Sequence, residues 1–208
     1  MCIAIIDYGM GNLKSVKKAF TALDLKADIT SDPESLLKAD KVVLPGVGAF
    51  RDAITTLNES GMSEAIDEVI KKGTPFLGIC LGMQLLFEKS YEYGEYKGLG
   101  VLPGEIVRFK PENMLLANGE SLKVPHMGWN NLEIVKPEPL FKDLKQQDYV
   151  YFVHSYYLET KADVVSCYTD YGTRIAVAAQ KDNVFATQFH PEKSGPVGLK
   201  ILKNFGGL

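Results

Sequence analysis

The sequence has little cysteine: Cys2, Cys80 and Cys167 are the three thiols among 208 residues. Their number is odd and no CxxC spacing occurs, which argues against a disulfide framework and against a structural zinc site. The three histidines also show no known zinc-binding spacing. We therefore expect a reduced compartment in which any reactive thiol stays free, and we expect no metal and no other cofactor.

Clustered positive charge and long hydrophobic runs are also missing. A net charge of -3 and a pI near 5.7 give no electrostatic reason to expect a nucleic-acid partner. No apolar stretch approaches the ~20 residues that span a bilayer. The N-terminal run lacks a basic leader and reaches Asp7 quickly, so it is typical of a strand rather than a signal peptide. We expect a cytoplasmic protein without a membrane partner.

The composition, 46% hydrophobic and 24% charged, predicts one globular domain over residues 1–208. Apolar runs of strand length alternate with amphipathic helical segments in the first half, which predicts right-handed crossovers and a parallel sheet with helices on both faces. Ser63 is a candidate cap of the fourth helix, and Gly73 ends it. The expected strands are Cys2–Asp7, Ala27–Thr30, Lys41–Leu44 and Thr74–Ile79, and the expected helices are Asn12–Leu23, Pro33–Lys38, Ala49–Asn58 and Ser63–Lys72.

From about residue 100 the pattern changes to strands and turns, and a final helix over Val197–Phe205 closes the chain. Asp182-Asn183 is a candidate hairpin turn, and Lys110–Glu120 is the expected exposed loop. The fold class is therefore α/β: a central, mostly parallel sheet with helices on both faces, plus added antiparallel strands in the C-terminal half. The expected strands here are Gly104–Phe109, Asn131–Val135, Tyr149–Leu158, Val164–Tyr168, Arg174–Gln180 and Val184–Phe189.

Cys80 lies where a buried-strand pattern runs into a helix, in Gly78-Ile-Cys-Leu-Gly82. Glycines two positions on either side of a nucleophile allow a strand and a helix to approach closely around a strained turn. The turn would place the thiol at a helix N-terminus, which favours the thiolate, and would point the amide of Leu81 at an oxyanion. Unpaired cysteines are usually packing residues, and we assign Cys2 and Cys167 to packing.

His190 is the candidate base, because a thiol nucleophile needs a base and a third group that orients it. It ends an expected strand, with Glu192 two residues on and Pro191 between them. In an extended segment both side chains face the same way, so Glu192 could bind one imidazole nitrogen while the other faces Cys80. His126 and His154 compete as bases, although neither has an acid two residues on.

With these two motifs in this order, the chain resembles the class I glutamine amidotransferases, and within them the glutaminase subunits of imidazole glycerol phosphate synthases. The resemblance covers essentially the whole chain, is weakest over Lys110–Glu120, and shows no departure at a motif position. The motifs that carry it, besides the two already described, are Pro45-Gly-Val-Gly-Ala-Phe50, Gly82-Met-Gln-Leu-Leu-Phe87, Val124-Pro-His-Met-Gly-Trp-Asn130, Tyr151-Phe-Val-His-Ser-Tyr156 and Gln188-Phe-His-Pro-Glu-Lys-Ser194.

The resemblance implies a Cys80, His190 and Glu192 triad that hydrolyses glutamine through a thioester. It also implies that the amide of Val47 joins that of Leu81 in stabilising the oxyanion. The substrate contacts that it implies are Gly48, Gln84, Ser155 and Tyr156.

The resemblance further implies a partner: a cyclase subunit with a (β/α)8 barrel, in a heterodimer that receives the ammonia. A barrel typically needs ~250 residues of its own, so the synthase half is expected on a separate polypeptide. The docking residues implied are Asn12, Trp129, Tyr151 and Lys193.

Three other readings stay open on the sequence alone. An amidotransferase could serve another acceptor, although the Pro45–Gly48 and Pro125–Trp129 segments favour the first reading. A cysteine hydrolase of similar fold would lack the glutamine contacts around Gln84 and Ser155. A noncatalytic binding module would show no alkylation-sensitive activity.

Overall fold

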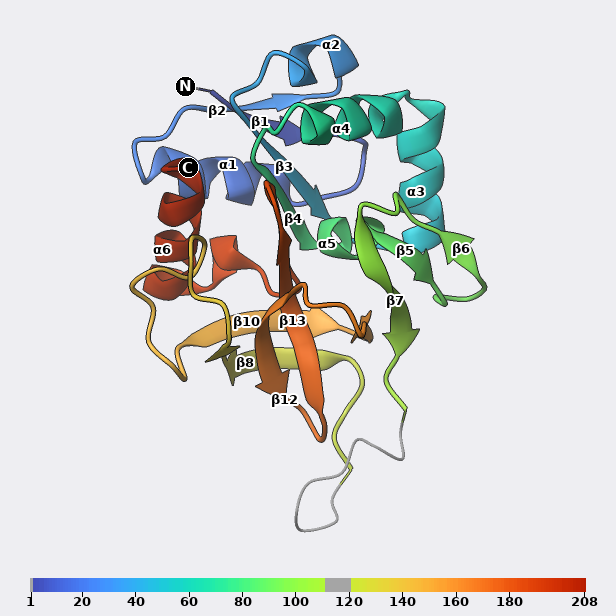
Figure 1. Ribbon diagram of the computed structural model, residues 1–208, viewed down its shortest axis with the longest axis vertical. Helices are drawn as coiled ribbons and strands as arrows, with labels where there is room; N and C mark the ends of the chain where they lie inside the picture. Colours follow the sequence, from blue (N-terminus) through green and yellow to red (C-terminus); the bar gives the residue numbers. More distant parts are fainter. Residues whose placement is uncertain (1, 111–120) are drawn as a thin grey trace.

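The computed structural model describes residues 2–110 and 121–208. Figure 1 shows a sheet that runs through the centre of the molecule, with most helices in the upper half of the view and antiparallel strands and turns in the lower half. The predicted exposed loop, Lys110–Glu120, lies outside the described residues except for Lys110. Among the described residues, no helix has the length and apolar character needed to cross a membrane.

The first half of the sheet is parallel. Its strands stand in the order β2, β1, β3, β4 and β14, and every neighbouring pair is parallel. Four of the five are buried along their length, because helices cover both faces, as is usual for parallel sheets. The bounds are β1 (Ile3–Ile6), β2 (Ala27–Thr30), β3 (Lys41–Gly46), β4 (Phe76–Cys80) and β14 (Val184–Thr187).

Helices cover both faces of this parallel half, as the alternating pattern predicts (Figure 1). On one face α1 (Leu13–Thr21) and α6 (Gly195–Gly206) bury their apolar sides, and their Phe20 and Phe205 rings lie 6.5 Å apart. The helices of the other face share a second core with β3 and β4. They are α2 (Pro33–Leu36), α3 (Phe50–Glu59), α4 (Met62–Lys71) and α5 (Leu81–Leu85).

The C-terminal half adds antiparallel strands. β14 pairs with β13, and the path continues through β11 and β7 to β5 and β6, with β5 parallel to β7. Off this path, β12 pairs with β13, and β9 pairs with β12. β8 and β10 form a separate two-stranded antiparallel sheet. This confirms the predicted α/β class. The bounds are β5 (Phe87–Ser90), β6 (Tyr96–Lys97), β7 (Leu102–Arg108), β8 (His126–Asn131), β9 (Glu133–Ile134), β10 (Tyr149–His154), β11 (Tyr156–Glu159), β12 (Val165–Asp170) and β13 (Arg174–Lys181).

Several local predictions need correction. The expected strand Tyr149–Leu158 is broken at Ser155, because β10 pairs with β8 and β11 pairs with β7. The expected strand Asn131–Val135 is divided between β8 and β9. Ser63 does not cap α4: the N-cap is Gly61 with φ 70, and the Ser63 hydroxyl donates to the side chain of Asn58.

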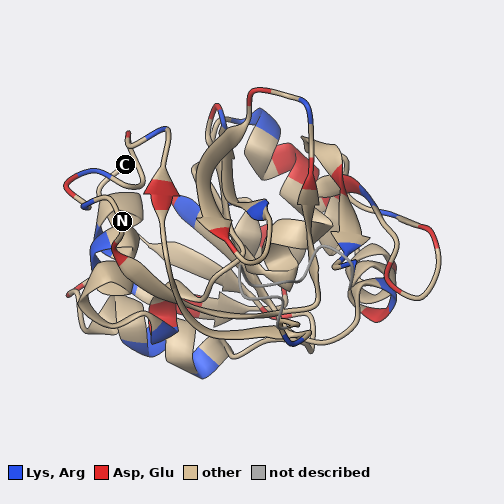
Figure 2. Cartoon of the chain, turned by 90° about the horizontal axis from the view of Figure 1, so that it is seen from below, with Lys and Arg blue, Asp and Glu red and all other residues tan. Residues whose placement is uncertain are grey.

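Two other turns follow the prediction. Lys181 and Val184 are partners in the β13–β14 pair, so Asp182-Asn183 is a two-residue hairpin turn, with Asp182 at φ 51. Gly73, at φ 84, follows the end of α4. Acidic and basic residues are intermingled over the molecule in Figure 2, in keeping with the small net charge.

Candidate active site

Cys80 stands on a strained turn at the end of β4. Its φ is 56 and its ψ is -112, a region that non-glycine residues rarely occupy, and α5 begins at the next residue. Gly82 is indispensable there, since a Cβ on it would lie 1.8 Å from the carbonyl oxygen of Leu44. A Cβ on Gly78 would meet the Gly82 carbonyl oxygen at 2.7 Å. The paired glycines therefore permit the close strand-to-helix turn that the sequence predicts.

The helix that follows Cys80 is short. α5 has five residues, and the chain then enters β5 at Phe87. A dipole of one turn contributes little to the charge of the thiol. The groups that activate the thiol therefore come from the strand beside β4.

That strand is β14, and it brings His190 to the nucleophile. Ile79 and Thr187 are partners in the parallel β4–β14 pair, so both chains leave the sheet at the same edge, where ligand sites of such sheets lie. The amide of His190 donates to the carbonyl oxygen of Tyr151 at 3.0 Å. Cys80 and His190 line one pocket.

Glu192 does reach His190, but not along an extended chain. Residues Pro191–Lys193 form a 3-10 turn, η2, instead of the expected extended segment. The turn brings Oε1 of Glu192 to 2.8 Å from Nδ1 of His190, and both side chains are almost fully buried. The other nitrogen, Nε2, is buried and has no regular hydrogen bond to any described atom. It is the nitrogen left for a proton transfer.

The pKa of His190 is raised to about 9. Burial alone would lower it, but the neighbouring Cys80 and the hydrogen bond to Glu192 both favour the imidazolium and outweigh burial. A thiolate and an imidazolium stabilise one another in such a pair. The raised pKa keeps His190 protonated near neutral pH, with a proton that it can donate.

His126 and His154 are poorly suited to act as bases. Nδ1 of His126 and Nε2 of His154 form a hydrogen bond of 3.0 Å, and Nδ1 of His154 donates to the carbonyl oxygen of Tyr156 at 2.8 Å. Burial lowers the pKa of His126 to about 4, and burial together with the charge of His126 lowers that of His154 to about 3. Both rings are neutral at pH 7, and His154 has no free nitrogen.

The pocket has a volume of about 410 Å³ and gathers most of the predicted residues. Glu192 lies behind His190 rather than in the wall. Asn12, Trp129, Tyr151 and Lys193, expected at a docking surface, also lie outside the lining that the structure describes. The lining residues are Val47, Gly48, Cys80, Leu81, Gln84, Glu92, Pro125, Val153, His154, Ser155, Tyr156 and His190.

Glu92 is a pocket residue that sequence reasoning missed. Its carboxylate accepts a hydrogen bond of 2.6 Å from the amide of Phe50, at the start of α3, beside the Val47–Gly48 segment. It lies just beyond β5, in a hairpin with β6 that the sequence did not predict. Gln188 was also missed: its Nε2 lies 3.8 Å from Sγ of Cys80. Its position two residues before His190 was the available signal.

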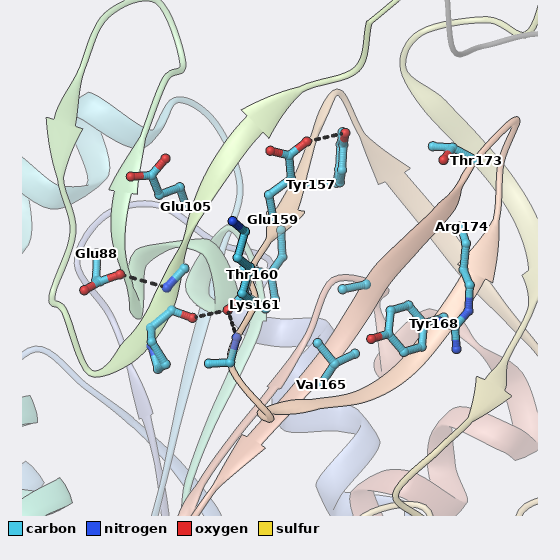
Figure 3. A pocket seen from close by; sticks show the side chains of 15 residues that line it. Glu88, Glu105, Tyr157, Glu159, Thr160, Lys161, Val165, Tyr168, Thr173 and Arg174 are labelled. Carbon is cyan, nitrogen blue, oxygen red and sulfur yellow. Dashed lines mark hydrogen bonds between the residues drawn. The ribbon is translucent and has the colours of Figure 1, made fainter.

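A larger groove, of about 730 Å³, lies over the antiparallel strands (Figure 3). Of the lining residues that the structure describes, none was predicted as a site residue. Several of its polar groups already have partners: Glu88 accepts from the amide of Gly104, Glu159 accepts from Tyr157, and Arg174 pairs with Glu133 outside the groove. The chemistry therefore belongs to the smaller pocket.

We expect the free energy of unfolding to fall between pH 6.5 and pH 9. The pKa of His190 is higher in the folded protein than its ordinary 6.5, so its contribution is complete below pH 6.5 and is lost as the pH rises through about 9. A shift of this size corresponds to about 3 kcal/mol. Urea denaturation at both pH values measures it. His190→Asn should lack this decline, and equal declines in both proteins would contradict the assignment.

Comparison with known proteins adds the family. The model of the class I glutamine amidotransferases matches residues 4–206. The imidazole glycerol phosphate synthase subunit HisH of Geobacter sulfurreducens is 55% identical over 207 residues, covering 99% of this chain and 98% of the relative. The HisH subunit of Syntrophotalea carbinolica is 53% identical, covering 99% and 100%.

Solved structures share the fold at lower identity. A crystal structure of a glutamine amidotransferase superposes with a TM-score of 0.74 at 20% identity, covering 99% of both chains. The PurLQS structure from Thermotoga maritima gives 0.74 at 17% identity, covering 98% of this chain and 96% of the other. Together with the family match over nearly the whole length, this shows that the chain belongs to the class I glutamine amidotransferase family.

Proposed function

We propose that this chain is the glutaminase subunit of an imidazole glycerol phosphate synthase in histidine biosynthesis. It hydrolyses glutamine to glutamate and ammonia and passes the ammonia to a cyclase subunit. The observation that carries the glutaminase assignment is the strained Cys80 beside a His190 that is held by Glu192, in one buried pocket. The full-length relatives named HisH subunits support the pathway.

The first half of the reaction is acyl transfer to sulfur. The thiolate of Cys80 attacks the side-chain carbonyl carbon of glutamine, and a C–S bond forms as the carbonyl electrons move to oxygen. The amides of Val47 and Leu81 stabilise this oxyanion. His190 gives its proton from Nε2 to the amide nitrogen, the C–N bond breaks, and ammonia leaves.

The second half returns the enzyme to its starting state. His190, now neutral, takes a proton from water, and the resulting hydroxide attacks the thioester carbon. The C–S bond breaks and the Cys80 thiolate re-forms beside the imidazolium. The new carboxyl group loses its proton to water, and glutamate leaves. Glu192 holds Nδ1 throughout, so that Nε2 keeps facing the sulfur.

The rest of the pocket suits the amino-acid end of glutamine. The carboxylate of Glu92 complements an α-ammonium group, and the Gln84 amide and Ser155 hydroxyl offer further hydrogen bonds. Gly48 and Tyr156 complete the wall beside them. Gly48 has φ 101, a conformation that lets the backbone of this segment lie close to a ligand.

The acceptor half is a separate cyclase subunit with a (β/α)8 barrel, and the two form a heterodimer. The cyclase uses the ammonia to make imidazole glycerol phosphate and aminoimidazole carboxamide ribonucleotide from its ribulosyl nucleotide substrate. Relatives that match this chain from end to end are themselves named subunits, which supports two polypeptides. We place the pair in the cytoplasm, where a reduced environment keeps Cys80 free.

The outer face of the β8–β10 sheet is the proposed docking surface. Trp129 and Tyr151 are partners in register and meet edge to face at 6.1 Å, and Trp129 is 56% exposed. Exposed aromatic residues are typical anchors of protein interfaces. η2 contacts both β10 and α1, so exposed Lys193 and half-buried Asn12 lie near the same surface.

The proposal is tested by mixing the purified chain with a cyclase subunit, the ribulosyl nucleotide and glutamine. We expect glutamate and imidazole glycerol phosphate to form together, and both to be lost with Cys80→Ser. Formation of glutamate alone would support the glutaminase activity and refute the cyclase as the acceptor of the ammonia. Neither product would refute both and would favour a hydrolase or a binding protein of the same fold.

A further inference from the structure

A row of side-chain amides joins the substrate pocket to the sulfur of Cys80. Gln188 is fully buried just after β14, and its Nε2 lies 3.8 Å from Sγ of Cys80. Its Oε1 accepts a hydrogen bond of 2.9 Å from Nε2 of Gln84. Nε2 of Gln84 also donates to the carbonyl oxygen of Tyr156 at 3.4 Å. The row thus runs from a backbone carbonyl, through two amides, to the nucleophile.

The backbone carbonyl fixes the direction of this row. A carbonyl oxygen only accepts, so Gln84 must turn its NH2 group toward Tyr156. The second hydrogen of that group then binds Oε1 of Gln188. Gln188 in turn must present its own NH2 group to Cys80, because its oxygen is already engaged. Reversal of either amide would place donor against donor or acceptor against acceptor.

The direction of these hydrogen bonds affects both Cys80 and the substrate pocket. An N–H donor against sulfur favours the thiolate over the thiol, since hydrogen bonds to a charged acceptor are the stronger ones. At the other end, Gln84 has committed its NH2 group and can offer only Oε1 to a ligand in the pocket. Networks of this kind in a buried site hold their members in one arrangement.

We propose that Gln188 is a positioning residue that sets the charged state of Cys80 and the orientation of Gln84 together. The inference rests on the proposed function of the same pocket and adds a residue that the triad does not include. The sulfur and the substrate contact are thus two ends of one hydrogen-bonded unit, although they belong to different steps of the reaction.

The test is the pH profile of Cys80 alkylation by iodoacetamide in the full chain, with the labelled residue identified by mass spectrometry. Gln188→Met keeps the length of the side chain and removes the amide. We expect the pH of half-maximal alkylation to rise by about one unit, as for the loss of one hydrogen bond to a charged group. The KM for glutamine of the complex with the cyclase should rise as well, because Gln84 loses its partner.

Two further variants separate positioning from packing. Gln84→Met should also raise the alkylation midpoint, but by less, although no hydrogen bond of Gln84 reaches the sulfur. If Gln188→Met does not fold, the result for Gln84→Met tests the proposal in its place. Gln180→Met, in neighbouring β13, is the matched control, because the Oε1 of Gln180 is buried without a partner among the described residues. It should leave the midpoint and KM unchanged.

A folded Gln188→Met with the midpoint and KM of the unchanged protein would overturn the inference while leaving the glutaminase intact. An unchanged midpoint in Gln84→Met would refute the coupling between the two ends. If Cys80 of the unchanged protein is not alkylated and no glutamate forms, the proposed function itself fails, and this inference falls with it.

Discussion

Cys80→Ala should reduce glutamine hydrolysis by the complex with the cyclase by about 10⁴-fold or more, the scale seen when a covalent nucleophile is removed. Without the sulfur no thioester can form, and His190 has no nucleophile to assist. Release of glutamate from glutamine measures the effect. The fold should be retained, since alanine fits wherever a cysteine side chain does.

Cys167→Ala is the matched control. Cys167 is fully buried in β12, where burial raises the pKa of its thiol and keeps it protonated. Its variant should hydrolyse glutamine at the unchanged rate. If Cys80→Ala kept more than about a hundredth of the activity, Cys80 would not be the nucleophile, and a mechanism through direct attack of water would have to replace the thioester.

His190→Ala should lower the same activity by about 10³-fold or more, because one group both activates the thiol and protonates the leaving ammonia. Glu192→Gln should lie between this variant and the unchanged protein, since it keeps the ring but loses the charge that holds Nδ1. Glutamate release at saturating glutamine gives kcat for each.

The combination of variants shows whether the residues act as one unit. The double variant Cys80→Ala with His190→Ala should be no slower than Cys80→Ala alone, because a base without its nucleophile contributes nothing. Added imidazole should partly restore His190→Ala through the cavity that the variant leaves. If the loss of activity in the double variant equalled the product of the two single losses, the two residues would act independently. That result, or unchanged activity in His190→Ala, would show that His190 does not act as the base for Cys80.

The parts of the fold that the sequence predicts are those with local rules. Buried strands such as β1 and β3 are continuous apolar runs, and the amphipathic period of α1 is plain. The turn at Cys80 is predictable because Gly78 and Gly82 are required sterically: a Cβ on either would collide with the backbone. These features depend on residues within a few positions of one another.

The parts that were missed depend on residues distant in sequence. The break at Ser155 arises because β10 and β11 pair with different partners, which no local pattern reveals. Glu92 enters the pocket only because β5 and β6 turn it back toward α3. Gln188 becomes important through Gln84 and Cys80, and the latter is 108 positions away.

The neighbouring positions of β4 and β14 also fix when this enzyme becomes reactive during translation. β4 emerges from the ribosome long before β14, and until then its Cys80 has neither a base nor a closed pocket. β14 then enters the middle of the sheet, between β4 and β13, rather than an edge. If His190 and Glu192 act as proposed, a chain that ends before β14 lacks both and should not hydrolyse glutamine.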